Sequence, residues 1–497
     1  MEKYKDFIKE KEMEHQKNEK RQRAVVINLG CKVNKYESDA IKDKLLAAGF
    51  LIVEPEAEAD IYIVNTCSVT NIAQKKSRQM LRRAKKRNSD AVVVAVGCYV
   101  NAEHEILKQE EFIDIVVGNN CKKDIIRVIE DYLQSREKKD SYIDINRTGE
   151  YEEMGSLDAS HLDHQRAYIK IQDGCNQFCS YCIIPYTRGR VRSRNPRHIL
   201  EEIRSLAKEG VKEFVLTGIH ISSYGADFGE KCIQYDELVK TNEETGEIGT
   251  REEKKMNLEG LIKKIADVPE VKRIRLGSLE PRIITKNFLE TLSKTDKVCP
   301  HFHLSLQSAC DATLKRMNRK YTVEEFMEKC GMIRRYFEKP AITTDVIVGF
   351  PGETEEEFSI TLENLKKLNL YEIHVFRYSV RGGTAAAGFS GQIPEEEKGR
   401  RSEILLNLTA EQKKAYEEFV KGLLDEVLIE EELTNSESSD DIVEVQMTEY
   451  EEDDMIRKDV KEDDKRIRYF TGHTKRYVKV KIAAYDNIVN RIMKVEL

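Results

Sequence analysis

Short β-branched runs that alternate with helical segments are the feature that most constrains the fold of this chain. Between residues 24 and 134 the runs AVVINLG, IYIVNT, AVVVAVG and FIDIVVG are separated by segments of helical character. Continuous apolar strands between helices are typical of a parallel sheet that helices cover on both faces. The sequence therefore predicts a doubly wound, flavodoxin-like α/β domain over residues 24–134.

A second alternating series extends from Ala167 to about Ser390. Its strand candidates are AYIKIQ, VKEFVLTG, KRIRLGS, HFHLSLQS, AITTDVIVG and YEIHVFRYS. The helix after the first strand has clear boundaries, because Asn195 suits a cap, Pro196 suits the first turn and Gly210 suits the end. Six strand–helix units predict an α/β domain with a (βα)6 partial barrel over residues 161–395. In such a barrel the functional loops follow the carboxyl ends of the strands.

The remaining segments differ from these two series. Residues 1–23 read as a charged leader, 135–160 as a polar linker and 229–256 as a surface insertion. From about residue 409 the pieces EVLIEE, DIVEVQM, YVKVKIAAY and IMKVEL indicate strands. They predict a small C-terminal all-β, OB-like barrel over residues 409–497, in which 434–465 is a strongly acidic loop.

Composition and charge exclude several classes of protein. The longest apolar runs are too short to cross a membrane, and the charged leader lacks the hydrophobic core of a secretory signal, so we expect a cytoplasmic protein with no membrane partner. The chain has eleven cysteines, which cannot all pair, and we expect it in a reducing compartment. Both points favour metal binding over a disulfide framework. The net charge of -7 does not by itself indicate nucleic acid, but the charge is unevenly spread.

Three cysteines follow the first barrel strand at a C-x3-C-x2-C spacing. Cys175, Cys179 and Cys182 offer three thiolates on one loop, which suits an iron–sulfur or a zinc site. A structural zinc site normally takes a fourth ligand, and no further cysteine or histidine occurs until His198. Three cysteines would leave one iron of a cubane cluster open for a substrate or cofactor. The spacing therefore favours an iron–sulfur cluster, with zinc as the alternative.

Three more cysteines occupy equivalent places in the N-terminal series. Cys31 follows NLG, Cys67 follows VNT and Cys98 follows AVG. All three therefore come just after predicted parallel strands, where doubly wound sheets bind their ligands. Any one of them alone would more often be an inert buried thiol. Three at one edge of a sheet favour a second cluster.

Basic segments give the chain possible contacts with RNA. The helix TNIAQKKSRQMLRRAKKR contains no acid, and its apolar residues Ile72, Ala73, Met80, Leu81 and Ala84 would let it pack while it presents a basic face. A merely solvated face is the alternative. Arginines also follow the cysteine loop, and guanidinium groups suit phosphates. Near the C-terminus, basic and aromatic residues alternate, which fits base stacking with phosphate contacts. The candidate RNA-binding residues are Arg82, Arg83, Arg188, Arg190, Arg192, Arg194, His473, Lys475 and Arg476.

Longer strings carry a family resemblance. KIQDGCNQFCSYCIIPYTRGRVRSR, with LTGIHISSYG, LGSLEP, HFHLSLQSACDATLKRMNR and DVIVGFPGETEEEF, resembles the radical S-adenosylmethionine (SAM) methylthiotransferases. The similarity extends from about residue 24 to the C-terminus. It points most closely to the class that acts on N6-threonylcarbamoyladenosine at tRNA position 37. The GHT stretch at 471–480 resembles a TRAM domain. The chain departs from the family where RGGTAAAG lacks the usual proline after the threonine, and at Ala309, where a glycine is common.

The resemblance implies the cofactors, partners and site residues. It implies two 4Fe–4S clusters, one on Cys175, Cys179 and Cys182 that binds SAM and yields a 5′-deoxyadenosyl radical. The auxiliary cluster, on the N-terminal cysteines, would handle the sulfur to be inserted, while SAM also donates the methyl group. Implied partners are tRNA, an electron donor such as a flavodoxin or ferredoxin, and a sulfur donor. Residues expected to contact SAM are Tyr181, Gly218, Ser278, Glu280, Gln307, Asp345 and Gly349.

Two other functions share these motifs. A methylthiotransferase that modifies an aspartate of a ribosomal protein would use the same two sets of cysteines. A non-catalytic, metal-bound RNA-binding protein would need only the cysteines and the basic segments. The remaining five cysteines show no ligand spacing and are expected to be structural.

Overall fold

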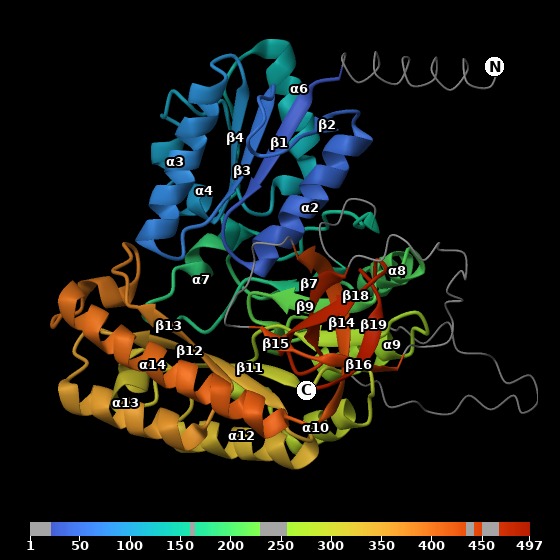
Figure 1. The fold of residues 1–497 in the computed structure, drawn as a ribbon. Coiled ribbons are helices and arrows are strands. Elements are labelled where there is room, and N and C mark those ends of the chain that lie inside the picture. The colour runs from blue at the N-terminus through green and yellow to red at the C-terminus, as the bar shows by residue number, and fades with distance from the viewer. Residues whose placement is uncertain (1–20, 160–164, 229–255, 434–441, 450–466) are drawn as a thin grey trace, which may run out of the picture. The chain divides into compact units, whose positions relative to one another are not determined.

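The computed structural model describes residues 21–159, 165–228, 256–433, 442–449 and 467–497 (Figure 1). The chain forms two compact units. The first comprises the part up to His161 with Asp173–Arg194 and Ser379–Ala387, and the second comprises Asn195–Tyr378, Gly388–Leu497 and the short segment that ends at Gln172. The predicted leader, insertion and acidic loop lie largely outside the described residues. No helix within these ranges is long and apolar enough to cross a membrane.

A six-stranded parallel sheet forms the centre of the first unit (Figure 1). Its strand order is β2-β1-β3-β4-β5-β6, and every neighbouring pair is parallel. The order 2-1-3-4-5 of the first five strands is that of flavodoxin-like folds, so the predicted fold class is confirmed. The strands are β1 (Arg23–Asn28), β2 (Leu51–Ile52), β3 (Ile61–Thr66), β4 (Val92–Gly97), β5 (Ile115–Val117) and β6 (Lys139–Ser141).

The core of this sheet follows from its apolar strands. Every residue of β3 and β4 is buried, as expected for strands that are covered on both faces. The strand β6, by contrast, is three polar residues inside the segment predicted as a linker. Backbone pairing with β5 rather than any side-chain pattern defines it. The helices of the unit are α2 (Lys32–Ala47), α3 (Asn71–Arg87), α4 (Cys98–Ala102), α5 (His104–Leu107), α6 (Ile125–Ser135) and α7 (Ile184–Thr187).

The second unit contains six parallel strands that form a partial barrel (Figure 1). Neighbouring strands pair in the groups β10-β9-β7 and β11-β12-β13, and a bridge between Leu279 and Leu304 joins the two groups. This confirms the predicted barrel. The strands are β7 (Arg166–Asp173), β9 (Glu213–Gly218), β10 (Arg273–Leu276), β11 (His301–Gln307), β12 (Ala341–Val348) and β13 (Glu372–Arg377). The helices are α8 (Pro196–Lys208), α9 (Leu258–Ala266), α10 (Lys286–Ser293), α11 (Asp311–Arg316), α12 (Val323–Tyr336) and α13 (Glu355–Leu368).

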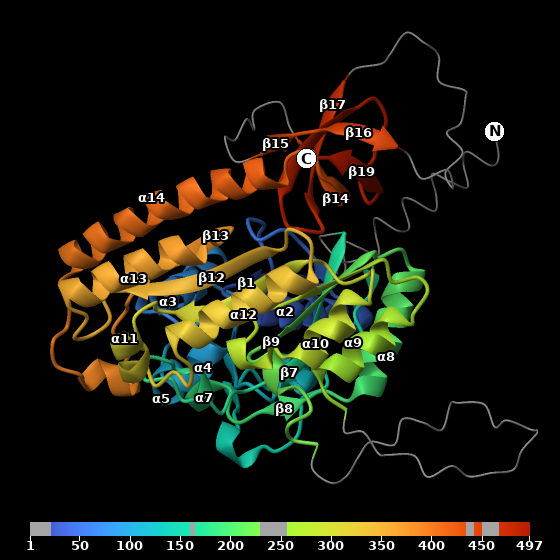
Figure 2. The same cartoon turned by 90° about the horizontal axis from the view of Figure 1, so that it is seen from below.

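A long helix precedes the C-terminal sheet. Helix α14 (Glu395–Val420) lies along β13 and α13 (Figure 2) and continues past residue 409, where we expected the all-β part to start. Its buried residues Leu405, Leu408 and Gln412 keep helical spacing. The sheet has the order β15-β18-β17-β14-β19-β16 and is antiparallel except for the pair β15-β18. Its strands are β14 (Leu424–Leu433), β15 (Val443–Glu444), β16 (Gln446–Glu449), β17 (Arg468–Thr474), β18 (Lys479–Ala484) and β19 (Ile492–Glu496).

Buried charges join this sheet to the amino-terminal ends of the barrel strands. Glu213, at the start of β9, forms ion pairs with Arg273 and Arg275 of β10, each with an N–O distance of 2.8 Å. The two guanidinium groups also donate to the backbone carbonyls of His473 and Thr474, at 3.1 Å. All three charged side chains are at most 2% exposed. The C-terminal sheet is therefore held on the barrel through one carboxylate and two guanidinium groups.

We predict that Glu213→Gln lowers the free energy of unfolding by about 3–5 kcal/mol, because it leaves two arginines buried without their carboxylate. Urea denaturation of the two proteins measures this difference. The control is Glu201→Gln, which removes an exposed i,i+4 pair with Arg197 and should change the free energy by less than about 0.5 kcal/mol. Equal losses in both variants would contradict the assignment of Glu213 as a buried anchor.

Candidate functional site

The N-terminal cysteines gather at one edge of the parallel sheet. Cys31 is the N-cap of α2, Cys67 directly follows β3, and Cys98 is the first residue of α4 after β4. Because β1, β3 and β4 are neighbours, the segments that carry the cysteines end at the same edge. A Cβ atom on Gly30 would lie 3.0 Å from the Cβ and Sγ atoms of Cys67, so glycine is needed where these two loops meet.

The chemistry of these side chains fits a cluster of iron and sulfide. Cys67 and Cys98 are buried, and all described cysteines are free. Burial, with smaller contributions from the neighbouring Cys98 and Cys31, raises the pKa of the Cys67 thiol to about 11. A positively charged metal centre would stabilise the thiolate, so the thiol would lose its proton when the metal binds.

Amide side chains bind the loops of this edge to one another. Asn34 Nδ2 donates to the carbonyls of Leu29 and Thr66, at 2.7 and 3.1 Å. Asn65 Nδ2 donates in turn to the carbonyl of Asn34 at 2.9 Å. On the far side, Asn119 Nδ2 lies 3.8 Å from Cys98 Sγ. These residues were not predicted, because the sequence does not distinguish a buried polar residue such as Asn34 from a solvated one.

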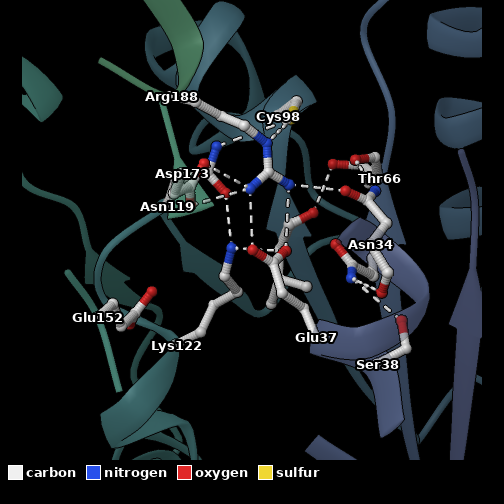
Figure 3. A network of polar contacts seen from close by, with 12 residues as sticks. Asn34, Glu37, Ser38, Thr66, Cys98, Asn119, Lys122, Glu152, Asp173 and Arg188 are labelled. Atoms are coloured by element: carbon white, nitrogen blue, oxygen red, sulfur yellow. Dashed lines mark hydrogen bonds and ion pairs between the residues drawn. The ribbon is translucent and has the colours of Figure 1, made fainter. Parts of the chain in front are cut away.

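Arg188 occupies the middle of this polar group (Figure 3). Its side chain is 0% exposed and pairs with Glu37 at 2.9 Å and with Asp173 at 3.2 Å. Burial alone would lower the pKa of the guanidinium, but Cys98, Glu37 and Asp173 raise it overall, so the charge is permanent. Lys122 Nζ completes the group by donating to Glu37 at 2.9 Å.

The second set of cysteines lies on the loop after β7. Cys175, Cys179 and Cys182 are all partly exposed. The backbone of the loop is closed by hydrogen bonds from Cys175 N to Gly189 O, at 3.0 Å, and from Cys182 N to Cys179 O, at 2.9 Å. Gly174 has φ +70°, and a Cβ atom there would lie 1.9 Å from the carbonyl oxygen of Arg190. Three thiols on one tightly wound loop fit a cluster with one iron left open. Tyr181, expected to contact SAM, is also partly exposed on this loop.

Most other residues expected to contact SAM lie where barrel strands end. Gly218 is the last residue of β9 and Gln307 the last of β11, where Gln307 has φ +73°. Gly349 directly follows β12 with φ +71°. Ser278 is exposed after β10, and Glu280 accepts hydrogen bonds from Arg282, at 3.0 and 3.2 Å.

Asp345 differs, because it lies inside β12 and has two histidine partners. Its carboxylate is 3.2 Å from His303 and 3.3 Å from His374. Burial raises the pKa of Asp345, but the two histidines lower it overall, and the pKa of His374 rises to about 9 through Asp345 and Glu372. Neither histidine was predicted from the sequence. Each carboxylate oxygen already has a ring nitrogen as its partner, so the three side chains satisfy one another.

The arginines after the cysteine loop do not form the exposed patch that we expected. Arg188, Arg192 and Arg194 are at most 1% exposed, and Arg194 pairs with Glu153 at 2.9 Å. Their burial leaves no guanidinium surface for a phosphate. Arg190 is the exception, because it is exposed and lies 4.4 Å from the centre of the Phe178 ring.

The C-terminal candidates also have other partners. His473 Nδ1 lies 2.8 Å from Glu430, Lys475 pairs with Glu426 at 2.7 Å, and Arg476 donates to the carbonyls of Glu338 and Lys339, at 3.0 and 3.1 Å. Glu430 and Glu426 belong to β14 of the same sheet, whereas the partners of Arg476 belong to the barrel domain. The charged or polar groups of all three residues are therefore already paired. Alternating basic and aromatic residues on a strand do not reveal whether a face meets solvent or another element.

The helix α3 does present a basic face. Leu81 and Ala84 are buried as expected, whereas Ile72 is 78% exposed and does not pack. Arg78 and Lys85 pair with Glu110 and Asp114. Within the described residues no ion pair involves the other exposed cations of the helix, which are Lys75, Lys76, Arg82, Arg83 and Lys86.

Comparisons with known proteins agree with this geometry. Residues 169–365 match the radical SAM superfamily, and residues 23–118 match the uncharacterized protein family UPF0004. The threonylcarbamoyladenosine tRNA methylthiotransferase MtaB of Bacillus subtilis is 36% identical over 94% of this chain and 92% of its own length. MtaB of Aquifex aeolicus is 36% identical over 83% of this chain and 94% of its length.

Two further proteins extend the comparison. The tRNA-2-methylthio-N6-dimethylallyladenosine synthase of Clostridium botulinum is 33% identical over 82% of this chain and 86% of its own length. The solved structure of the radical SAM methyltransferase TsrM from Kitasatospora setae has a TM-score of 0.50 at 15% identity, over 71% of this chain and 73% of that one. This second likeness concerns the fold alone. The length and identity of the matches to the curated relatives establish that the chain belongs to the radical SAM methylthiotransferase family.

Proposed function

We propose that this enzyme converts N6-threonylcarbamoyladenosine at tRNA position 37 to its 2-methylthio derivative. The observation that carries this function is the match to the MtaB proteins over nearly the whole chain. Its cofactors are SAM and 4Fe–4S clusters. The ribosomal-protein substrate and the non-catalytic RNA-binding protein lose support, because the relatives in both named groups are tRNA-modifying enzymes.

The two sets of cysteines would hold the two clusters. Cys175, Cys179 and Cys182 are suited to the cluster that binds SAM, because a three-thiol loop leaves one iron open. Cys31, Cys67 and Cys98 are suited to the auxiliary cluster at the edge of the parallel sheet. When bound, these groups supply the radical and the sulfur chemistry. The chain supplies the thiolates and the closed loops that hold them.

The RNA surface that we propose is the basic face of α3, together with Arg190. Five exposed cations of one helix, without an acidic partner in the described part of the chain, give a local positive field on a chain of net charge -7. The C-terminal sheet would act as a TRAM domain by another face than the GHT stretch. An electron donor such as a flavodoxin or ferredoxin, a separate sulfur donor and a cytoplasmic location complete the proposal. The domain limits proposed are 24–134 and 161–395, with a C-terminal all-β part that begins at Leu424, after α14, rather than at residue 409.

Iron content tests the ligand sets. Replacing Cys175, Cys179 and Cys182 together by Ala should leave about half of the iron of the reconstituted protein, because one of two four-iron clusters is lost. Replacing Cys31, Cys67 and Cys98 should do the same. The control is Cys330→Ala, which removes a buried thiol outside both sets and should keep all of the iron. Full iron content in either triple variant would refute that ligand set.

Product analysis tests the reaction and the division of labour between the clusters. With threonylcarbamoyladenosine-containing tRNA, SAM, a reductant and sulfide as the sulfur donor, the enzyme should form the 2-methylthio nucleoside, detected by nucleoside mass spectrometry. The variant without Cys31, Cys67 and Cys98 should still release 5′-deoxyadenosine but form no methylthio product. Methylthiolation of dimethylallyladenosine instead would assign the substrate of the Clostridium relatives. Normal product from the triple variant would exclude the sulfur role.

Salt dependence of tRNA binding tests the basic face. If the protein neutralises roughly five to eight phosphates, the log–log slope should be about -3.5 to -7. The double variant Arg82→Gln, Arg83→Gln should weaken binding and reduce that slope by about one to two units. A control that replaces the exposed Arg204 and Lys208 of α8 by Gln should leave the slope unchanged. Equal effects of both double variants would mean that overall charge, and not this face, attracts tRNA.

A further inference from the structure

Arg188 uses every N–H group of its guanidinium inside the first unit. Nη1 donates to Glu37 at 2.9 Å and to both carboxylate oxygens of Asp173 at 3.2 Å. Nη2 donates to Asn34 at 2.7 Å and to Glu37 at 3.1 Å. The remaining donor, Nε, points at Cys98 Sγ, 3.1 Å away (Figure 3). The guanidinium therefore connects two carboxylates, an amide and a thiol without any contact with solvent.

The contact with sulfur is not needed to bury this charge. Glu37 binds both Nη atoms of Arg188 in the two-pronged manner typical of arginine–carboxylate pairs, and Asp173 adds a second carboxylate. A neutral thiol is a weak acceptor. A thiolate bound to metal is a strong one, and it would give the buried Nε–H group a partner that matches its charge. The arrangement thus fits a Cys98 that is a thiolate ligand.

Arg188 also contacts the segment that leads into the second set of cysteines. Asp173 ends β7 two residues before Cys175, the first cysteine of the other set. The same guanidinium that touches Cys98 therefore also fixes the chain directly before the cysteine loop. Arg188 itself follows that loop after α7. One side chain thus couples the edge of the parallel sheet to the segment that carries Cys175, Cys179 and Cys182.

We propose that Arg188 is a positioning residue of the auxiliary cluster, whose Nε–H bond to the Cys98 thiolate favours the reduced state of that cluster. This inference rests on the ligand assignment proposed above. Hydrogen bonds to cluster sulfurs are among the factors that set the reduction potential, and a donor with a positive charge stabilises the more negative, reduced form. Without it, the auxiliary cluster should be harder to reduce.

The test uses protein in which Cys175, Cys179 and Cys182 are replaced by Ala, so that only the auxiliary cluster contributes. A potentiometric titration followed by electron paramagnetic resonance compares this background with the added substitution Arg188→Gln. We expect the ratio of reduced to oxidised cluster at a fixed potential to fall about tenfold, which is a shift of about 59 mV for one electron. Arg188→Lys keeps the charge and should recover part of this shift.

Lys122→Gln is the matched control. Lys122 is equally buried and donates to the same Glu37 and to Asn119, at 2.9 and 2.7 Å. Among the described residues it makes no hydrogen bond to a cysteine sulfur. Replacing Lys122 disturbs the same polar group. It should change the ratio of reduced to oxidised cluster at the fixed potential by less than about twofold. A shift as large as that of Arg188→Gln would overturn the proposal, because it would show a general effect of buried charge. An unchanged potential in Arg188→Gln with full iron would overturn it as well.

If both Arg188 variants lose iron, the contact can still be tested in protein that keeps Arg188. In the same background, labelling with 15N-arginine should give a nitrogen hyperfine coupling to the reduced cluster in pulsed resonance spectra, since Nε lies 3.1 Å from a ligand sulfur. Absence of this coupling would refute the contact. Absence of any iron from the background protein would instead refute the auxiliary ligand set, so the two failures are distinguishable.

Discussion

Parallel strands that end at one edge are the constraint on which the rest of the first unit depends. Cys31, Cys67 and Cys98 are far apart in the sequence, and only the order β1-β3-β4 brings the segments that carry them together. In a parallel sheet the next helix begins near the end of each strand, so Cys31, the N-cap residue of α2, lies at the same edge as the end of β1. The same geometry in the barrel places Gly218 and Gln307 at strand ends. Backbone topology therefore assembles both candidate centres.

Both units contain buried charges, but these lie at opposite ends of the strands in the two units. Around Arg188 the charges lie at the carboxyl edge, next to thiols that are candidates for chemistry. Around Glu213 they lie at the amino-terminal ends of the barrel strands, where the C-terminal sheet covers them. In parallel α/β folds the carboxyl edge carries function and the opposite end carries stability. A buried ion pair seldom stabilises more than an apolar pair would, so its value lies in fixing one geometry.

Sequence patterns predicted most of the fold because the strands concerned are continuous apolar runs. The strands β3 and β4 are buried throughout, which leaves no ambiguity about their period. The two-residue β2 and the polar β6 were missed, since backbone pairing with an existing strand defines them and no side-chain pattern does. The positions of the cysteines could also be predicted, because residues that directly follow parallel strands all lie at the carboxyl edge of the sheet. The partners Glu37, Asn34 and Lys122 could not, because buried polar residues on a helix look like solvated ones.

The arginine series shows that the spacing of residues does not reveal which side chains are exposed. Arg188, Arg190, Arg192 and Arg194 are spaced by two, and in a regular extended segment they would share one face. Here α7 ends at Thr187, and Gly189 takes φ +72° where a Cβ atom would lie 2.8 Å from the carbonyl of Ile145. This turn separates Arg188 from Arg190, so one guanidinium points to Cys98 while the next lies over Phe178. Charge spacing alone predicts attraction for nucleic acid. The backbone at one glycine decides instead that Arg188 reaches a thiol while Arg190 stays exposed.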